Sequence, residues 1–408
     1  MSDLKELLDG IAAQAPRYDV LDGIRARRRR RTLRLRVAGS GAGAAAFAAV
    51  AVLLAVHLGV HPKPDPATPT PSASATSSPA PKPVLSTCEV RQLPVPRGYP
   101  PKSVLTAGDP TGRFLAGRAY PGDGRPRLLI WDDGRVRAIR EPGADAGFEA
   151  IAADGTAVVT AFEGDTKAAW LYRDGRMTRL AGADPIIAAV NTAGVIVGMS
   201  GGRPVVWRPP YGAPQPLSTA GGVPVDPTSI AEDGTIAGVL RDSAVGPVRE
   251  PNEDLPTAHD QAVLLLPDGT ERVLELPEEI DDRPLKGVRG VQLGDGFVTA
   301  LLYAGSSTDT VVRLARWELG TFQLRLQRMP HGGNLLGADG WTVGAEGLGN
   351  VLVSPSGTVA LPNLPGASDD PYDRPNFRAI SADGRTVGGY VTMPGEGVLV
   401  VAVRWRCG

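Results

Sequence analysis

The sequence predicts an all-β protein carried on one membrane-spanning α-helix, and three observations support this prediction. The chain of 408 residues holds 51 glycines and 38 prolines, a turn-rich composition that argues against a helical fold. From residue 84 onward, short apolar strands recur around Asp-Gly-type turns. Before them, one uncharged stretch of 24 residues, 37–60, is long enough to cross a bilayer.

Residues 1–36 are predicted to be a basic cytoplasmic head. They contain ten Lys and Arg against five Asp and Glu, whereas residues 84–408 contain 31 against 38. Eight of the ten basic residues are arginines between residues 25 and 36, directly before the apolar stretch. Such a cluster stays on the cytoplasmic side of the membrane. The charge split favours two compartments over a nucleic-acid-binding protein.

Residues 37–60 predict a transmembrane helix, because at about 1.5 Å per residue they can span a hydrocarbon core of about 30 Å. The alternative is the apolar part of a cleaved secretory signal. That part is about 7–15 residues long behind a short basic segment, whereas 36 residues precede this one. We therefore expect an uncleaved signal-anchor in the cell membrane, crossing it once, with the N-terminus cytoplasmic and the C-terminal domain extracellular.

Residues 61–83 are predicted to be a disordered stalk. They contain eight prolines in 23 positions, mixed with Ser, Thr and Ala. This composition cannot build a core and stays extended.

Seven copies of one pattern fill residues 84–408. Each copy has a strand, a tight turn and a second strand, as in AIAADGTAVVTA, and the turn glycine supplies the positive φ that such turns need. A second hairpin such as LLIWDDGRVRAI follows in most copies. The turn glycines, spaced by 43, 39, 40, 62, 44 and 44 residues, are Gly112, Gly155, Gly194, Gly234, Gly296, Gly340 and Gly384. Four strands in about 40–45 residues predict a seven-bladed β-propeller, with six or eight blades as alternatives.

The two half-motifs, A-I-x-x-D-G-x-x-V-G and W-x-D-G-x-x-x-x-L, resemble the degenerate units called extracellular HAF repeats. They resemble WD-type and TolB-type propellers more loosely. The resemblance covers roughly residues 100–408, and it implies the propeller fold while saying little about function. Two copies depart from the pattern, with Leu266 and Ser354 where others have Trp or Tyr.

The seventh copy stops after its third strand, so one outer strand is missing from the ring. Residues 88–95, CEVRQLPV, have the length and alternation of that strand, and an open ring would leave strand edges unpaired. We therefore expect residues 88–95 to complete the last blade, and Cys88 to form a disulfide with Cys407 in the oxidising exterior. The alternative is two unrelated free thiols.

Few residues form a catalytic pattern. Ser200 in GMSGG matches G-x-S-x-G, but it joins two strands, so we expect a turn residue rather than a nucleophile. His259 and His331 lie in separate copies without the spacing of paired metal ligands. We expect no cofactor, no metal and no enzymatic activity, and a propeller enzyme is the remote alternative. The once-per-copy aromatic residues favour packing in the core over a sugar-binding platform.

Two acidic stretches and one insertion remain as candidate sites. Glu278–Asp282 and Asp369–Asp373 could chelate calcium, but neither has an EF-hand or nonapeptide spacing, which favours solvated loops.

The 62-residue spacing accommodates an insertion, residues 241–260, between the second and third strands of the fourth copy. Insertions on a rigid scaffold often bind ligands, and a disordered ornament is the alternative. The candidate binding residues there are Arg249, Glu250, Asn252, Glu253, Asp254, His259 and Asp260.

Two function classes remain open. The first is a non-enzymatic binding or interaction module, whose extracellular ligand or protein partner contacts the propeller loops. The second is a transmembrane regulator in which the propeller senses and residues 1–36 contact a cytoplasmic partner. That layout is similar to membrane-bound anti-sigma regulators of high-GC bacteria, but the head lacks the zinc-binding His and Cys residues of their best-known class. No nucleic-acid partner is expected.

Overall fold

The computed structural model describes residues 85–121, 125–241, 260–306, 309–337, 340–346, 349–354, 357–368, 373–394 and 399–408. The chain divides into two units, Met1–Ser77 and Ser78–Gly408, and all described residues belong to the second. Within them, no helix is long and apolar enough to cross a membrane. The predicted head (1–36), membrane segment (37–60) and stalk (61–83) lie outside the described residues, as does the candidate binding loop except Asp260.

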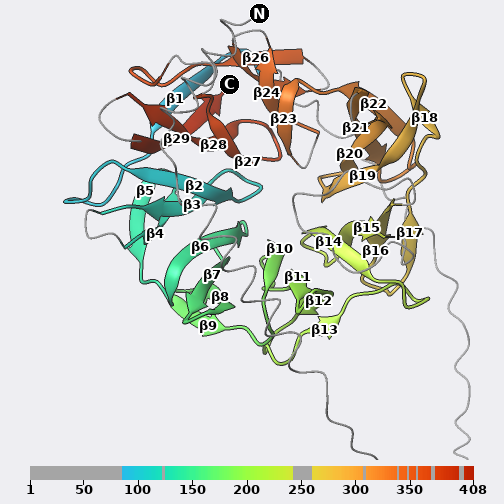
Figure 1. Cartoon of the computed structure of the whole chain (residues 1–408), viewed down its shortest axis with the longest axis horizontal. Coiled ribbons are helices and arrows are strands. Elements are labelled where there is room, and N and C mark those ends of the chain that lie inside the picture. The colour runs from blue at the N-terminus through green and yellow to red at the C-terminus, as the bar shows by residue number, and fades with distance from the viewer. Residues whose placement is uncertain are drawn as a thin grey trace, which may run out of the picture. The chain divides into compact units, whose positions relative to one another are not determined.

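The described strands form seven antiparallel sheets in a ring, which is the predicted seven-bladed propeller (Figure 1). From the ring axis outward, blade 1 consists of β2 (Ser103–Gly108), β3 (Phe114–Ala119), β4 (Arg127–Asp132) and β5 (Arg135–Ile139). Blade 2 consists of β6 (Ala144–Ile151), β7 (Ala157–Glu163), β8 (Thr166–Arg173) and β9 (Arg176–Arg179). Blade 3 consists of β10 (Ile186–Val190), β11 (Ile196–Ser200), β12 (Arg203–Trp207) and β13 (Gln215–Pro216).

The remaining blades follow in chain order around the ring. Blade 4 consists of β14 (Val225–Ile230), β15 (Ile236–Leu240), β16 (Gln261–Leu265) and β17 (Glu271–Val273). Blade 5 consists of β18 (Glu279–Ile280), β19 (Arg283–Leu293), β20 (Phe297–Ser306), β21 (Asp309–Glu318) and β22 (Leu324–Arg328). Blade 6 consists of β23 (His331–Leu336), β24 (Thr342–Glu346), β25 (Gly349–Ser354) and β26 (Gly357–Leu361). Apolar side chains pack between adjacent blades, as between blades 1 and 2 and between blades 4 and 5.

Blade 7 takes strands from both ends of the propeller unit. Its inner strands are β27 (Asn376–Ile380), β28 (Thr386–Met393) and β29 (Leu399–Cys407), and its outermost strand is β1 (Cys88–Gln92). β1 runs antiparallel to β29, with Cys88 opposite Cys407 and Val90 opposite Trp405. A disulfide joins the two cysteines. The structure thus confirms the disulfide and the closing strand predicted from the sequence, although the strand ends at Gln92 rather than at residue 95.

A glycine in the second strand of several blades follows from a bulge in the innermost strand. In six blades the innermost strand shifts register against its neighbour, and in blade 5 β19 does so against β20, which increases the local twist. The bulge brings a backbone carbonyl onto the facing strand, so a Cβ on Gly117 would lie 2.1 Å from the Val104 oxygen, and one on Gly198 would lie 2.2 Å from the Ile186 oxygen. This close approach explains the second glycine of the repeat motif.

Each odd-numbered blade has one tryptophan that forms a hydrogen bond to the blade before it, which makes four such residues in the ring. Their side chains are at most 1% exposed, so the expectation that they pack in the core is confirmed. Each indole N–H donates to a backbone carbonyl just beyond the outer strand of the preceding blade. These bonds run from Trp131 to Pro94 (2.7 Å), Trp207 to Ala181 (2.7 Å), Trp317 to Glu275 (3.1 Å) and Trp405 to Pro362 (2.8 Å). The first of these bonds crosses the closure of the ring.

The acidic stretch at residues 278–282 is part of a hairpin, and its four acidic residues are exposed, as expected for a solvated segment. Asp281 and Asp282, with φ of 52° and 58°, form a two-residue turn between β18 and β19. Ile280 beside them is 2% exposed, so this segment adds a fifth strand to its blade. The Asp281 carboxylate accepts a hydrogen bond from Arg313. Burial of one apolar residue and pairing with arginine therefore explain the stretch. Of the other acidic stretch, Asp369 and Asp370 lie outside the described residues.

Replacing Cys407 by Ser should lower the melting temperature of the propeller and leave its β-sheet circular dichroism at low temperature unchanged, because the bond acts chiefly on the unfolded chain. For a sequence separation of 319 residues, the chain-entropy relation gives about 5–6 kcal/mol as an upper value. Tryptophan fluorescence of the full-length chain can follow the melt, since all six tryptophans belong to the propeller. Reductant should shift wild type to the same extent and leave the variant unmoved. Equal melting of variant and wild type would contradict the closure.

Trp131→Phe should destabilise the propeller by about 1–3 kcal/mol, because it removes the hydrogen bond to the Pro94 oxygen and leaves a cavity beside the fully buried ring. Trp207→Phe removes the equivalent bond between blades 2 and 3 and serves as the matched control. In a Cys407→Ser background, Trp131→Phe should cost more than in wild type, whereas the cost of Trp207→Phe should not change. Urea unfolding measures both. If the losses in unfolding free energy from Trp131→Phe and Cys407→Ser simply add in the double variant, the Trp131 indole does not hold the closing strand.

Candidate functional site

The candidate site lies where blade 7 meets blade 1, on the outer layer formed by β1 and β29. Side chains alternate across a strand, so Val90 and Trp405 face the core while the residues on either side of them face out. On the outward face Glu89 lies opposite Arg406, and Arg91 lies opposite Arg404. Like charges directly opposite each other on a sheet are unfavourable. The closing pair of strands therefore carries an excess of positive charge on one face.

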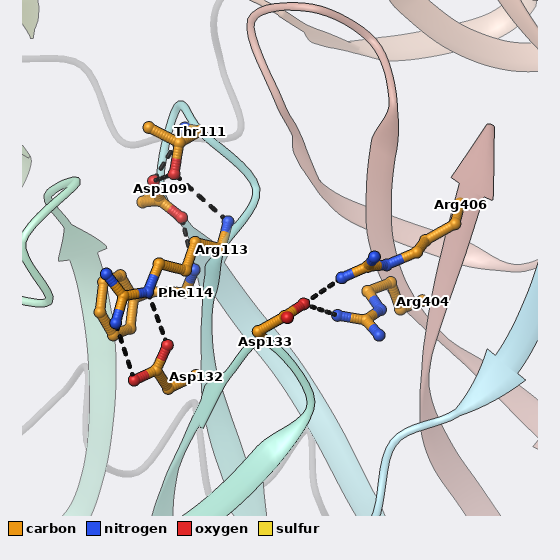
Figure 2. A network of polar contacts seen from close by, with 8 residues as sticks. All are labelled: Asp109, Thr111, Arg113, Phe114, Asp132, Asp133, Arg404 and Arg406. Carbon is orange, nitrogen blue, oxygen red and sulfur yellow. Dashed lines mark hydrogen bonds and ion pairs between the residues drawn. The ribbon is translucent and has the colours of Figure 1, made fainter. Parts of the chain in front are cut away.

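Asp133 reaches this positive face from blade 1 (Figure 2). It is the first residue of the two-residue turn between β4 and β5, where φ is 46° at Asp133 and 86° at Gly134. Its Oδ1 accepts hydrogen bonds from Arg404 Nη1, at 3.5 Å, and from Arg406 Nη2. The ion pairs join segments about 270 residues apart in sequence, since the separations are 271 and 273. Asp133 is thus a bridge across the closure of the ring.

Arg404 is the most enclosed cation of the group. Its side chain is 14% exposed, and Gly134 leaves space for it, because a Cβ there would lie 3.3 Å from Arg404 Nη2. Burial lowers the pKa of Arg404 from its usual value, and the charges of Arg406 and Arg91 lower it further, while Asp133 opposes them. Arginine stays charged at neutral pH in spite of this. Arg404 is therefore a desolvated cation that Asp133 only partly compensates.

Two adjoining cavities open around Asp133. One has a volume of about 310 Å³ and is lined by Glu89, Arg91, Asp133, Arg404 and Arg406. The other has a volume of about 460 Å³ and is lined by Thr111, Gly112, Arg113, Asp133, Asp383, Arg385, Thr386, Arg406 and Cys407. Together they present five arginines and three carboxylates, and both contain Asp133 and Arg406. Their volumes are in the range of small-molecule sites.

The β2–β3 turn forms a fixed wall of the second cavity. The buried carboxylate of Asp109 accepts hydrogen bonds from the Thr111 N–H (2.8 Å) and the Phe114 N–H (2.6 Å), and also from the Thr111 hydroxyl. Arg113 donates to both carboxylate oxygens of Asp132, at 2.7 and 3.1 Å. This hydrogen bonding raises the pKa of Arg113 and lowers that of Asp132. Arg113 is thus held by two hydrogen bonds to one carboxylate, whereas Arg91, Arg385, Arg404 and Arg406 each have a single contact with a carboxylate that lines the cavities.

Of the candidate binding residues predicted in the insertion, Asp260 is the one that the structure describes, and it does not line these cavities. Antiparallel strands place the turns after the first and third strands of a blade on one face of the ring, and the connection between the second and third strands on the other. The insertion joins β15 to β16, so its two described ends, Arg241 and Asp260, lie on the face opposite Asp133. There, Asp226 pairs with Arg241 at 2.5 Å. Burial raises the pKa of Asp226 and Asp260 adds to this rise, while Arg241 opposes it.

The other residues singled out in the sequence have structural surroundings. Ser200 is the last residue of β11 rather than a turn residue. Its Oγ accepts a hydrogen bond from the Ala183 N–H (3.0 Å) and donates to the Ala183 oxygen (3.2 Å). His331 begins β23, and His259 lies outside the described residues. Among the described residues, no group of three or more His, Cys, Asp or Glu side chains is placed to hold a metal ion.

Sequence reasoning missed the arginines of the closing strands. One signal for them was available, because the strand predicted for residues 88–95 alternates and residues 404–407 read RWRC. Once Cys88 is placed opposite Cys407, the alternation puts Arg91, Arg404 and Arg406 on one face. No sequence signal indicates that Asp133 lies beside these arginines, because this contact depends on how blade 1 packs against blade 7.

Comparison with known proteins concerns the fold alone. No protein-family model matches the chain, and no curated protein matches it significantly. Similar solved structures include β-propeller proteins. TolB from Acinetobacter baumannii is 17% identical, with a TM-score of 0.34, over 55% of this chain and 54% of TolB. A gluconolactonase from Xanthomonas campestris is 15% identical, with a TM-score of 0.36, over 80% of this chain and 99% of that one. A puromycin-hydrolyzing peptidase from Mycobacterium tuberculosis is 15% identical, with a TM-score of 0.45, over 78% of this chain and 54% of the peptidase. The chain thus spans about half the length of TolB and of the peptidase.

Proposed function

We propose that the protein is a membrane-anchored propeller, displayed outside the cell, that binds an anionic ligand at the closure of its ring without catalysing a reaction. The observation that carries this proposal is the pair of adjoining cavities lined by five arginines and three carboxylates. A guanidinium is always charged and offers its donors in a fork that matches carboxylates and phosphates. Partial burial, as at Arg404, strengthens its attraction for an anion.

Binding is favoured over catalysis by the kinds of side chain that line the cavities. The lining residues include no histidine, and the only cysteine, Cys407, is bonded to Cys88. Neither an imidazole base nor a thiol nucleophile is thus available within the lining. The membrane anchor and the extracellular location rest on residues 37–60 and on the arginines before them, and the disulfide suits an oxidising exterior.

Isothermal titration of the full-length chain in detergent, with citrate and separately with inorganic phosphate, tests this function. We expect wild type to bind at least one of these anions, and Arg404→Gln to weaken that binding by about ten- to a hundredfold, as expected for the loss of a charge-assisted hydrogen bond. Arg179→Gln is the control, because Arg179 forms an exposed ion pair with Glu163 on blade 2. If neither anion binds wild type, or if Arg404→Gln binds as well as wild type, the proposed site is wrong.

A second candidate function is a transmembrane regulator, and the charge split of the chain favours it. Residues 1–36 combine a basic segment with apolar residues at helical spacing, which would suit a cytoplasmic partner. In this arrangement the propeller would sense the anion and the head would signal. A sigma-factor gene beside the gene for this chain would favour the regulator over a simple binding module.

Both functions require the same membrane topology, which proteolysis can test. With a tag at each terminus, protease added to intact protoplasts should remove residues 61–408 and spare residues 1–36, because the arginine cluster keeps the head inside. Lysed protoplasts provide the control in which both tags are digested. Loss of the N-terminal tag alone from intact protoplasts would contradict the topology.

A further inference from the structure

We propose that Asp133 is a tethered anion that holds the place of the ligand at the closure site, and that a ligand with two or more carboxylates displaces it. This inference rests on the proposed function and adds the class of ligand and a residue that limits its affinity. It starts from the position of one carboxylate, which belongs to blade 1 but binds two arginines of blade 7.

The contact of Asp133 with the arginines is weak enough to be replaced. Its side chain is 65% exposed, and one oxygen, Oδ1, serves both arginines, at 3.5 Å from Arg404 Nη1. The pair with Arg406 is exposed on both sides, at 55% and 65%, and exposed ion pairs contribute little to stability. The more buried Arg404 makes only the longer contact. An external carboxylate can therefore exchange with Asp133 at a small cost.

The turn that carries Asp133 does not have to move during this exchange. The Asp133 N–H donates to the Arg113 oxygen at 2.8 Å, and the flanking residues Asp132 and Arg135 are paired across the hairpin. Only the side-chain torsions of Asp133 would change, and exposed side chains change rotamer within picoseconds to nanoseconds. Asp133 is thus a mobile group on a fixed support.

Displacement of Asp133 would join the two cavities into one site. Asp133 and Arg406 line both the 310 Å³ and the 460 Å³ cavity, so Asp133 lies at their common boundary. Arg91 and Arg404 face the first cavity, and Arg385 faces the second. A ligand that spans both cavities meets cations on either side of the boundary, so several carboxylates would be paired at once. A ligand with a single carboxylate would do no more than replace Asp133.

The closing strands hold positive charge that Asp133 does not neutralise. Arg91 and Arg404 are directly opposite each other in the β1–β29 register, an unfavourable placement for like charges. Burial lowers the pKa of Arg404, and the neighbouring charges of Arg406 and Arg91 lower it further. Of the lining carboxylates, Glu89 pairs with Arg91 at 3.2 Å and Asp383 approaches Arg385 at 3.8 Å. A multivalent anion would relieve the repulsion that remains around Arg404 and Arg406.

Asp133→Asn tests this inference without disturbing the turn. Asn-Gly is a favoured pair for a two-residue hairpin turn, and Asn tolerates the positive φ of 46° found at this position. Full-length wild type and variant would be titrated with citrate and, in parallel, with inorganic phosphate. We expect Asp133→Asn to bind citrate about tenfold more tightly than wild type, because the internal competitor has lost its charge. Citrate should also raise the melting temperature of the variant more than that of wild type.

The control variant is Glu163→Gln, which removes the carboxylate from another exposed ion pair, with Arg179 at 2.9 Å on blade 2. Its citrate affinity should equal that of wild type. If citrate binds wild type and Arg404→Gln abolishes binding, but Asp133→Asn binds no more tightly, Asp133 is not a tethered anion and the proposed function stands. If phosphate gains as much as citrate from Asp133→Asn, the assignment to polycarboxylates is wrong. If neither anion binds wild type or Asp133→Asn, the proposed function fails together with this inference.

Discussion

The pairing of β1 with β29 is the interaction on which the rest of this propeller depends. Without it, the last blade would end in an exposed strand edge, which is prone to pair with other chains. Five residue pairs, Cys88–Cys407 to Gln92–Val403, form the ladder, and the disulfide stands at its end. Trp131 of blade 1 adds a hydrogen bond to Pro94, directly after the strand. Sheet pairing, a covalent bond and packing from the next blade thus hold the same short segment.

The same closure creates the candidate site. Alternation along β1 and β29 buries Val90 and Trp405, and this leaves Arg91, Arg404 and Arg406 on the outer face. Blade 1 then brings the turn with Asp133 onto that face (Figure 2). Because its residues come from both ends of the ring and from the next blade, the site exists only while the ring is closed. An anion bound there would therefore stabilise the closed ring by mass action.

The sequence was sufficient to predict the ring but not the site. Regular turn glycines, an incomplete seventh copy and two cysteines were enough to predict seven blades, the closing strand and the disulfide, because each follows from local turn chemistry and from the need to pair every strand. The bulges of the inner strands and the hairpin at Asp281 were missed, since both depend on how blades pack near the axis and at the rim. The contact of Asp133 with Arg404 was missed for the same reason: it joins two blades whose relative placement no short motif encodes.

Mass spectrometry of the full-length protein, alkylated and then digested without reduction, tests the closure most directly. Cleavage after Arg91 and Arg406 would leave the dipeptide Cys407–Gly408 attached to the peptide that contains Cys88. The closed ring predicts this one cross-linked species, with no alkylated cysteine in the folded monomer. Recovery of both cysteines as alkylated free thiols, or of Cys88 bonded to a second copy of the chain, would contradict it.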